Sequence, residues 1–326
     1  MLIRKICILG GTGFVGRSLA NRLAGDGYAL RVLTRDRERN RAALILLPAL
    51  ELTEADVHDP SQLARHFAGC DAVINLIGIL NERGRDGAGF RHAHVELAEK
   101  VVAACRQSGV RRLLHMSALN ADARNGPSHY LRSKGEAEDK VQAAHDLRVT
   151  SFRPSVIFGP GDRFFNRFAG LLRMMPGLFP LACAGARFAP VFVEDVVEAF
   201  ARALVNPDTY GRRLNLCGPR VYTLEQLVRY TAECIQARCR IIALPDLLSR
   251  LQAAVFDFVP GKPFSTDNYL SATIDSVCER NDLDGMGIAP TPLEAIVPQY
   301  LCRRVVKARY DRFRSRSRRN AGGAPV

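Results

Sequence analysis

The sequence lacks the features that would assign it to a membrane-spanning or metal-binding class. No apolar run approaches the roughly 18–20 residues that a membrane-spanning helix needs. Its nine cysteines have no metal-ligand spacing, and the closest pair, Cys234 and Cys239, forms only a CxxxxC pattern. Its seven histidines are dispersed, and His92 and His94 do not share one face of a helix. We therefore expect neither a transmembrane span nor a metal site.

Two further absences bear on the compartment. The first expected strand starts at residue 2 or 3, which leaves no room for a signal or transit peptide. Cysteines such as Cys7 and Cys70 lie in or beside apolar runs, as small core residues do. We therefore expect a reducing, cytoplasmic compartment, with a peripheral position at the inner face of the membrane as an option.

The formal net charge of +13 is spread unevenly along the chain. Residues 302–326 contain nine Arg or Lys and one Asp, a net charge of +8. This stretch ends in low complexity and is predicted to be disordered. It serves either as a solubility tail or as a surface attracted to anionic lipid or to a partner subunit. Nucleic acid is disfavoured because no aromatic and basic interleaving occurs elsewhere in the chain.

The first half of the chain alternates between strand-like and helix-like segments. Apolar runs predict strands, and 96–105 has helical periodicity. The predicted strands are 6–9, 30–33, 72–77, 112–116 and 149–152. This alternation predicts an α/β fold with a doubly wound parallel sheet of the Rossmann type. A ligand is then expected at the carboxyl ends of the strands.

After about residue 158 proline and glycine become frequent and the alternation weakens. The periodicity predicts helices over 164–174, 194–204, 224–236 and 247–256. We divide the chain into a nucleotide-binding core (1–158), a smaller and mainly helical lobe interleaved with it (159–301), and the basic tail (302–326). The segment 241–264 is rich in Leu and Phe. It either packs within the lobe or presents an apolar face to a membrane or a lipid-like substrate.

A glycine-rich turn follows the first strand directly and opens a helix. In this order the glycines let the backbone approach a pyrophosphate, and the helix N-terminus offers free N–H groups to the phosphates. The turn predicts a dinucleotide site. Its glycines are Gly10, Gly11, Gly13 and Gly16.

The end of the second predicted strand favours NADP(H) over NAD(H). An NAD site of this kind has an acidic residue there, which holds the ribose hydroxyls. Here Arg35 lies near that position, and a guanidinium can bind a 2′-phosphate through two charge-assisted hydrogen bonds. Asp36, one position later, is the evidence against this preference.

Tyr130 and Lys134 form a YxxxK pair, which places both side chains on one helical face. A lysine ammonium near a phenol, with the positive ring of an oxidised nicotinamide close by, lowers the pKa of the phenol. The pair therefore predicts a general acid or base for hydride transfer.

These motifs together resemble the short-chain dehydrogenase/reductase superfamily of the extended or atypical, NAD-dependent epimerase/dehydratase-like kind. Further blocks are similar, in chain order, to the NAD(P)H-binding accessory subunit family of respiratory complex I. The resemblance covers about residues 3–300. Its motifs are GGTGFVG, INLIG, HMSALNA, YLRSKGEAE, RPSVIFGPGDRFFNRFA, PVFVEDV and GIAPTPLE.

The resemblance implies further cofactor contacts. They are the amides of Thr12, Phe14 and Val15 with Gly10, Gly13 and Gly16 at the pyrophosphate, Asp56 and Val57 at the adenine, Leu76 to Gly78 at the adenosine and ribose, Lys134 at the nicotinamide ribose, and Pro154 to Val156 beside the nicotinamide. It also reveals a departure, because Ala118 takes the place of the catalytic Ser or Thr of active members and Ser117 lies one residue early. Loss of one such donor typically costs about 10²–10³ in rate.

Three functions remain open on this reading. The first is a protein that holds NADPH as a structural or redox ligand, as in the complex I subunit family. The second is an active NADP(H)-dependent oxidoreductase on a quinone-pathway or isoprenoid-type substrate, with Tyr130, Lys134 and Ser117 as catalytic residues. The third is a sugar-nucleotide epimerase or dehydratase, which Ala118 and the apolar lobe argue against.

Overall fold

The structure is a computed structural model that describes residues 2–302, apart from 45–46, 48 and 176. Of the predicted basic tail, residues 303–326 lie outside the described residues.

The centre of the molecule is a seven-stranded sheet in the order β11-β6-β5-β4-β1-β2-β3, in which every neighbouring pair is parallel. The strand order reverses beside β1, so the chain winds outward in both directions, and the predicted doubly wound fold is confirmed. The strands are β1 (Lys5–Leu9), β2 (Ala29–Thr34), β3 (Leu50–Glu54), β4 (Ala72–Asn75), β5 (Arg112–Met116), β6 (Arg148–Pro154) and β11 (Arg212–Leu216).

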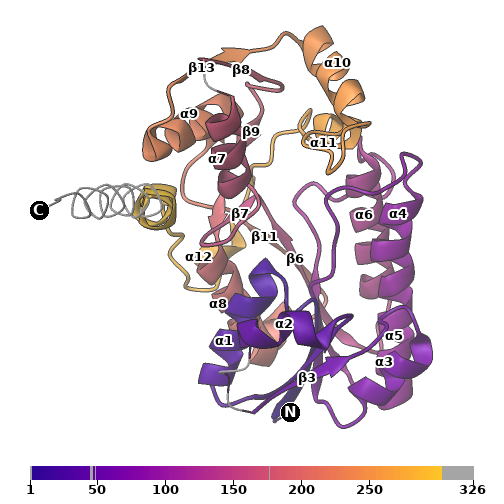
Figure 1. Ribbon diagram of the computed structural model, residues 1–326. Helices are drawn as coiled ribbons and strands as arrows, with labels where there is room; N and C mark the ends of the chain where they lie inside the picture. Colours follow the sequence, from indigo (N-terminus) through magenta and orange to yellow (C-terminus); the bar gives the residue numbers. More distant parts are fainter. Residues whose placement is uncertain (1, 45–46, 48, 176, 303–326) are drawn as a thin grey trace, which may run out of the picture.

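Helices cover both faces of this sheet (Figure 1). The helices of this part are α1 (Phe14–Gly25), α2 (Arg37–Leu44), α3 (Pro60–Phe67), α4 (Ala88–Phe90), a π-helical turn (Arg91–Glu96), α5 (Leu97–Ser108), α6 (His129–Gln142), α8 (Val193–Val205) and a 3₁₀ turn (Pro207–Thr209).

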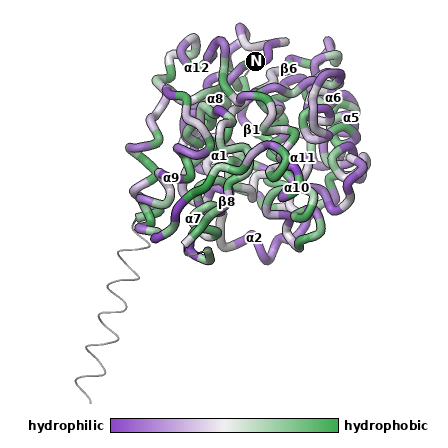
Figure 2. The backbone as a smooth tube through the Cα atoms, turned by 90° about the horizontal axis from the view of Figure 1, so that it is seen from above, coloured by the Kyte–Doolittle hydropathy of each residue, from purple (hydrophilic) through white to green (hydrophobic). Residues whose placement is uncertain are grey.

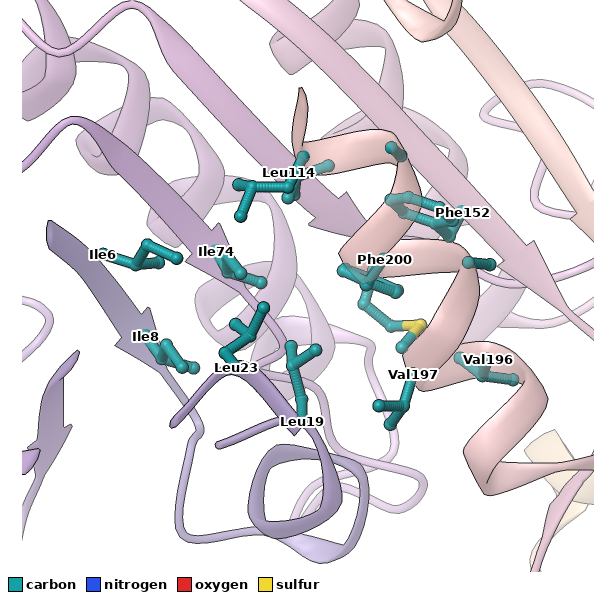
Figure 3. Packing of buried hydrophobic residues seen from close by; sticks show 14 of the residues in the cluster. Ile6, Ile8, Leu19, Leu23, Ile74, Leu114, Phe152, Val196, Val197 and Phe200 are labelled. Carbon is teal, nitrogen blue, oxygen red and sulfur yellow. The ribbon is translucent and has the colours of Figure 1, made fainter. Parts of the chain in front are cut away.

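Alternate residues of each central strand feed two separate apolar cores. On β1, Ile6 and Ile8 pack with α1 and α8, as Figure 3 shows, whereas Cys7 and Leu9 pack with α3 and α5 on the opposite face. A strand buried on both faces reads as a continuous apolar run. This is why the sequence 6–9 is apolar throughout.

The second half of the chain builds a lobe beyond one end of the sheet, drawn at the top of Figure 1. Its own apolar core joins α7, α9 and the helical segment 293–302. The lobe is interleaved with the core, since β11 returns to pair with β6. Its elements are α7 (Phe165–Met174), α9 (Leu224–Ile235), α10 (Asp246–Phe256), α11 (Thr266–Ser271) and the short pairs β7 (Ile157–Phe158) with β10 (Val191–Phe192), β9 (Arg187–Phe188) with β12 (Tyr222–Thr223), and β8 (Gly177–Leu181) with β13 (Cys239–Ala243). The last short helix, α12 (Asp282–Gly285), lies instead against β11, where Asp282 accepts the Asn215 N–H and Leu283 joins the core of the sheet.

Two findings bear on the predicted absences. Within the described part of the chain, no helix combines the length and the hydropathy that crossing a bilayer requires. A disulfide joins Cys217, after β11, to Cys278. The sequence did not predict this bond, because the two cysteines are 61 positions apart and only folding brings them together.

Candidate functional site

The glycine turn leaves β1 and enters α1 at the centre of the sheet, where the strand order reverses. Gly10 has a φ of +76°, a conformation that favours glycine. Gly16 lies against the turn itself, since a Cβ atom there would come within 2.2 Å of the carbonyl oxygen of Gly10. The backbone can pack this tightly only because both residues lack side chains.

The N-terminus of α1 is free to bind an anion. The helix begins at Phe14, its N-cap Gly13 has no side chain to cap it, and its first turn contains no acidic residue. The first N–H groups of a helix have no carbonyl partner within it, and they carry the positive end of the helix dipole. Gly13 donates its own N–H to the Gly10 carbonyl at 3.0 Å, so the predicted residues Thr12, Phe14 and Val15 supply the backbone donors suited to a pyrophosphate.

Of the two charged residues that follow β2, Asp36 accepts a backbone hydrogen bond, whereas Arg35 has no such partner in the part of the chain that the structure describes. Asp36 accepts a hydrogen bond from the Arg39 N–H at 2.9 Å and so caps the start of α2. Arg35 is exposed, and no ion pair holds it among the described residues. The Arg35 guanidinium is therefore available to a nucleotide at the position where an NAD site would have a carboxylate.

The residues after β3 and β4 lie around the same end of the sheet. Asp56 is exposed and accepts the His58 N–H, while its neighbour Val57 is buried. The segment after β4 contacts the glycine turn, since a Cβ atom on Gly10 would lie 3.2 Å from the backbone of Leu76. A Cβ atom on Gly78 would lie 2.9 Å from Nζ of Lys134. The glycine turn, the segment after β4 and Lys134 therefore form one continuous surface.

The YxxxK pair occupies the first turns of α6. Ser128 caps this helix through the Leu131 N–H, and Asp267 of α11 accepts the N–H groups of His129 and Tyr130 at 2.7 and 3.2 Å. Lys134 is buried, and its Nζ donates to the Met116 carbonyl oxygen at 2.9 Å. The end of β5 and the lobe thus fix the pair from two sides.

Protein groups alone shift the pKa of Tyr130 in the direction opposite to that predicted. Burial, together with the nearby charge of Asp267, raises the pKa of Tyr130 to about 12. Burial lowers the pKa of Lys134 to about 8, so its ammonium is itself disfavoured in this environment. The predicted lowering of the Tyr130 pKa requires the positive nicotinamide ring as well as Lys134, so it stays a prediction for the nucleotide-bound protein.

Ser117 is tied into a buried ion network instead of being free to bond a substrate. Its hydroxyl donates to Glu138 at 2.5 Å, and Glu138 also pairs with Arg153 and Arg213 at 2.9 and 2.6 Å. The next residue, Ala118, is buried and has no donor to offer.

Two histidines to which the sequence assigned no role in the site line the buried side of the pair. His94, in the π-helical turn, accepts the Ile79 N–H through Nε2, so its Nδ1 carries the proton and donates to Ser133 Oγ at 2.8 Å. Its ring also lies edge-on to Tyr130, with 5.8 Å between centroids. His115 is buried on β5, and its Nε2 has no partner among the described residues. A π-helical turn often marks a functional region, but it leaves no clear signal in a single sequence.

The remaining predicted residues border the lobe. The Pro154 carbonyl accepts the Leu119 N–H, and the Val156 carbonyl accepts the Val191 N–H, so Pro154 to Val156 is held in place beyond β6. Asp162 caps α7 through the Asn166 N–H. Arg167 donates to the Lys262 carbonyl oxygen at 2.7 Å and joins α7 to the segment after α10.

Comparison with known protein families identifies the group of proteins to which this chain belongs. Residues 6–217 match the "NAD dependent epimerase/dehydratase family", a span that includes the glycine turn, the YxxxK pair and all seven strands of the sheet. The chain belongs to this family. Its dinucleotide-binding architecture is thereby shown, and no cluster of potential metal-binding side chains occurs in the part of the chain that the structure describes.

Within this family, the chain is related to subunits of respiratory complex I. It is 30% identical over 295 residues to the mitochondrial "NADH dehydrogenase [ubiquinone] 1 alpha subcomplex subunit 9" of Rattus norvegicus, covering 88% of this chain and 77% of the relative. It is 31% identical over 241 residues to a "Ceramide reductase" of Caulobacter vibrioides, covering 74% of each chain.

Solved structures confirm the fold. Pal from Bacillus thuringiensis matches with a TM-score of 0.75 at 17% identity, over 93% of this chain and 99% of that one. A dTDP-glucose 4,6-dehydratase from Streptomyces venezuelae, solved with NAD bound, matches with a TM-score of 0.71 at 18% identity, over 91% and 95%. At these identities the likeness concerns the fold alone.

Proposed function

We propose that this epimerase/dehydratase-family protein holds NADP(H) as a structural or redox ligand and does not turn over a substrate rapidly. The observation that carries the proposal is the state of Ser117. Its hydroxyl donates to Glu138 while Ala118 offers no replacement, so the donor that would polarise a substrate carbonyl is missing beside an intact nucleotide turn.

The preference for NADP(H) rests on Arg35 and Asp36. The carboxylate of Asp36 accepts the Arg39 N–H, and Arg35 is exposed at the end of β2. A 2′-phosphate would gain a charge-assisted partner in Arg35. Its contacts with the remaining nucleotide are proposed to come from Gly10 to Gly16, Asp56, Val57, Leu76, Gly78, Lys134, Pro154 and Val156.

The proposed setting is peripheral, against a respiratory complex or the inner face of a membrane. Support comes from the relationship to the complex I subunit and from the net charge of +8 in residues 302–326. In this setting the bound nucleotide would stabilise the fold or report the redox state of the nicotinamide pool, and the lobe would contact the partner.

The nucleotide proposal is tested by mass spectrometry of the ligand that co-purifies with the full chain, followed by titration with NADPH and NADH. We expect NADPH to be retained and to bind more tightly than NADH. The Arg35→Asp variant should reverse the preference. Unchanged selectivity in that variant would refute the role of Arg35, and a chain that binds neither nucleotide would refute the proposal as a whole.

A second candidate is an active NADP(H)-dependent reductase on a quinone-pathway, isoprenoid-type or other lipid-like substrate. Tyr130 and Lys134 favour it, since the i, i+4 pair is present, and so does the relationship to a ceramide reductase. NADPH consumption with such a substrate that is abolished in Tyr130→Phe would establish this function. Activity that survives this substitution would exclude Tyr130 as the proton donor.

A further inference from the structure

Helix α10 carries an apolar face that no other described element covers. Leu247 is 76% exposed, Leu251 59% and Phe258, just beyond the helix, 75%. These positions recur at helical spacing, so they lie on one side, opposite the buried Ser249 and Ala253. Leu248, Val255 and Val259 are also exposed and extend the same surface, which we call the α10 face.

The α10 face continues onto its neighbours in the lobe. Gln252 of α10 bonds the Pro180 carbonyl of β8, and β8 pairs with β13, so the three elements are contiguous. Leu178 on β8 and Ile242 on β13 are exposed at 59% and 41%. Seen from the lobe end in Figure 2, hydrophobic segments lie along both β8 and α10. An exposed apolar surface of this extent normally marks an interaction site.

Cations border this surface. The Arg85 guanidinium lies over the Phe258 ring, 3.7 Å from its centroid, and Lys262 donates to the Gly84 carbonyl in the same loop. Arg83 is exposed beside them, and Arg240 is exposed on β13 next to Ile242. A guanidinium stacked on an exposed aromatic ring is the arrangement of an interfacial anchor, with an apolar body and a charged tip at the water boundary.

We propose that the α10 face docks onto an anionic lipid bilayer. An apolar helix face with basic side chains at its edge matches the acyl and headgroup layers of such a bilayer. The net charge of +13 adds long-range attraction to anionic lipid. We favour a bilayer over a protein partner because the apolar face and its basic edge match the two layers of an anionic membrane together.

Docking here would bring the candidate site close to the membrane. The segment that follows α10 reaches the site through Asp267, which caps α6 at His129 and Tyr130, and through the Lys262 carbonyl, which accepts hydrogen bonds from Arg167 and Asn81. The α10 face is thus connected to the candidate site through the chain that follows α10 and through these hydrogen bonds. The docking proposal itself does not rest on which nucleotide is held or on turnover.

The absence of tryptophan from the chain allows a direct test. Phe258→Trp places a single fluorophore on the α10 face, and Val205→Trp places one at an exposed apolar position on α8 as a matched control. A third variant, Phe313→Trp, reports on the basic tail. Each full-length variant is titrated with vesicles of phosphatidylcholine alone and of phosphatidylcholine with phosphatidylglycerol, at low and at high salt, and with lipids brominated along their acyl chains.

We expect the emission of Phe258→Trp to shift to the blue and to be quenched by brominated lipid in anionic vesicles, and Val205→Trp to show neither effect. Leu251→Ser in the Phe258→Trp background should weaken partitioning of the protein into anionic vesicles about tenfold, since it removes one of the apolar side chains that would insert into the bilayer. A response confined to Phe313→Trp and lost at high salt would assign lipid binding to the tail and overturn the proposal. A blue shift of Phe258→Trp without vesicles, rising with protein concentration, would show that a second copy covers the face and would also overturn it.

Discussion

The hydroxyl of Ser117 donates to Glu138 at 2.5 Å, and both side chains are buried beside the candidate site. Glu138 is neutralised by two arginines, so Ser117 completes a structural network that holds the end of β5 against α6. The hydroxyl therefore contributes to stability and is not available to a substrate.

Ser117→Ala should lower the free energy of unfolding by about 1–3 kcal/mol, because a buried carboxylate oxygen loses a donor. NADPH affinity should stay within about twofold of the parent, since the glycine turn and Arg35 are untouched. Chemical denaturation and nucleotide titration measure the two quantities. A variant with normal stability but a loss of about a hundredfold in any reductase activity would show instead that Ser117 serves the reaction.

Gly16→Ala should abolish nucleotide binding and destabilise the core. The added Cβ atom would approach the Gly10 carbonyl oxygen to 2.2 Å, so the turn must open where the pyrophosphate is expected. Gly25→Ala is the matched control in the same helix, because a Cβ atom there meets nothing within 4 Å. We expect Gly25→Ala to bind NADPH normally. Equal affinity for NADPH in both variants would exclude the turn from the binding site.

Local signals in the sequence were sufficient for the glycine turn and for five of the seven strands of the sheet. The two strands at its edges, β3 and β11, were not predicted. The strand 112–116 was predicted with its observed bounds from its apolar centre, Leu113 and Leu114, although the fold also buries Arg112 and His115. The turn was predicted because its glycines and its helix are adjacent in the chain.

The surroundings of the YxxxK pair could not be predicted in the same way. Asp267 caps Tyr130 from 137 residues away, and His94 reaches Ser133 across 39 residues. The direction of the Tyr130 pKa shift depends on burial by these distant groups, which the spacing of Tyr130 and Lys134 does not report. The spacing of the pair therefore predicts a shared helical face, but not the burial that opposes ionisation of the phenol when no nucleotide is bound.

Acid should destabilise the protein through its buried histidines. Burial lowers the pKa of His115 to about 3, and burial with the charge of Lys134 lowers the pKa of His94 well below its usual value. Between pH 6.5 and 3 the unfolded chain therefore binds a proton at His115 that the folded chain does not, and His94 acts in the same direction below pH 6.5. Stability then falls as the pH falls, by about 1.4 kcal/mol per pH unit for each such histidine.

The comparison that isolates this contribution is His115→Leu against the parent chain, by denaturant titration at several pH values from 7 to 4. The difference in unfolding free energy between parent and variant should shift by about 1.4 kcal/mol per pH unit below 6.5, in favour of the variant. A difference that stays constant over this range would mean that His115 is protonated in the folded protein.

Reduction of the Cys217–Cys278 disulfide should loosen the lobe more than the sheet. The bond closes a loop of 61 positions that includes α9, α10 and Asp267, and it joins this loop to the end of β11. Cross-links of this size typically stabilise by about 2–4 kcal/mol, because they restrict the unfolded chain. We expect Cys217→Ser with Cys278→Ser, or treatment with a dithiol, to lower the free energy of unfolding by this amount. Limited proteolysis should then begin between α9 and α11, while NADPH protects β1 and α1 as before. Identical stability and cleavage patterns with and without the dithiol would show that the two cysteines are not paired in solution.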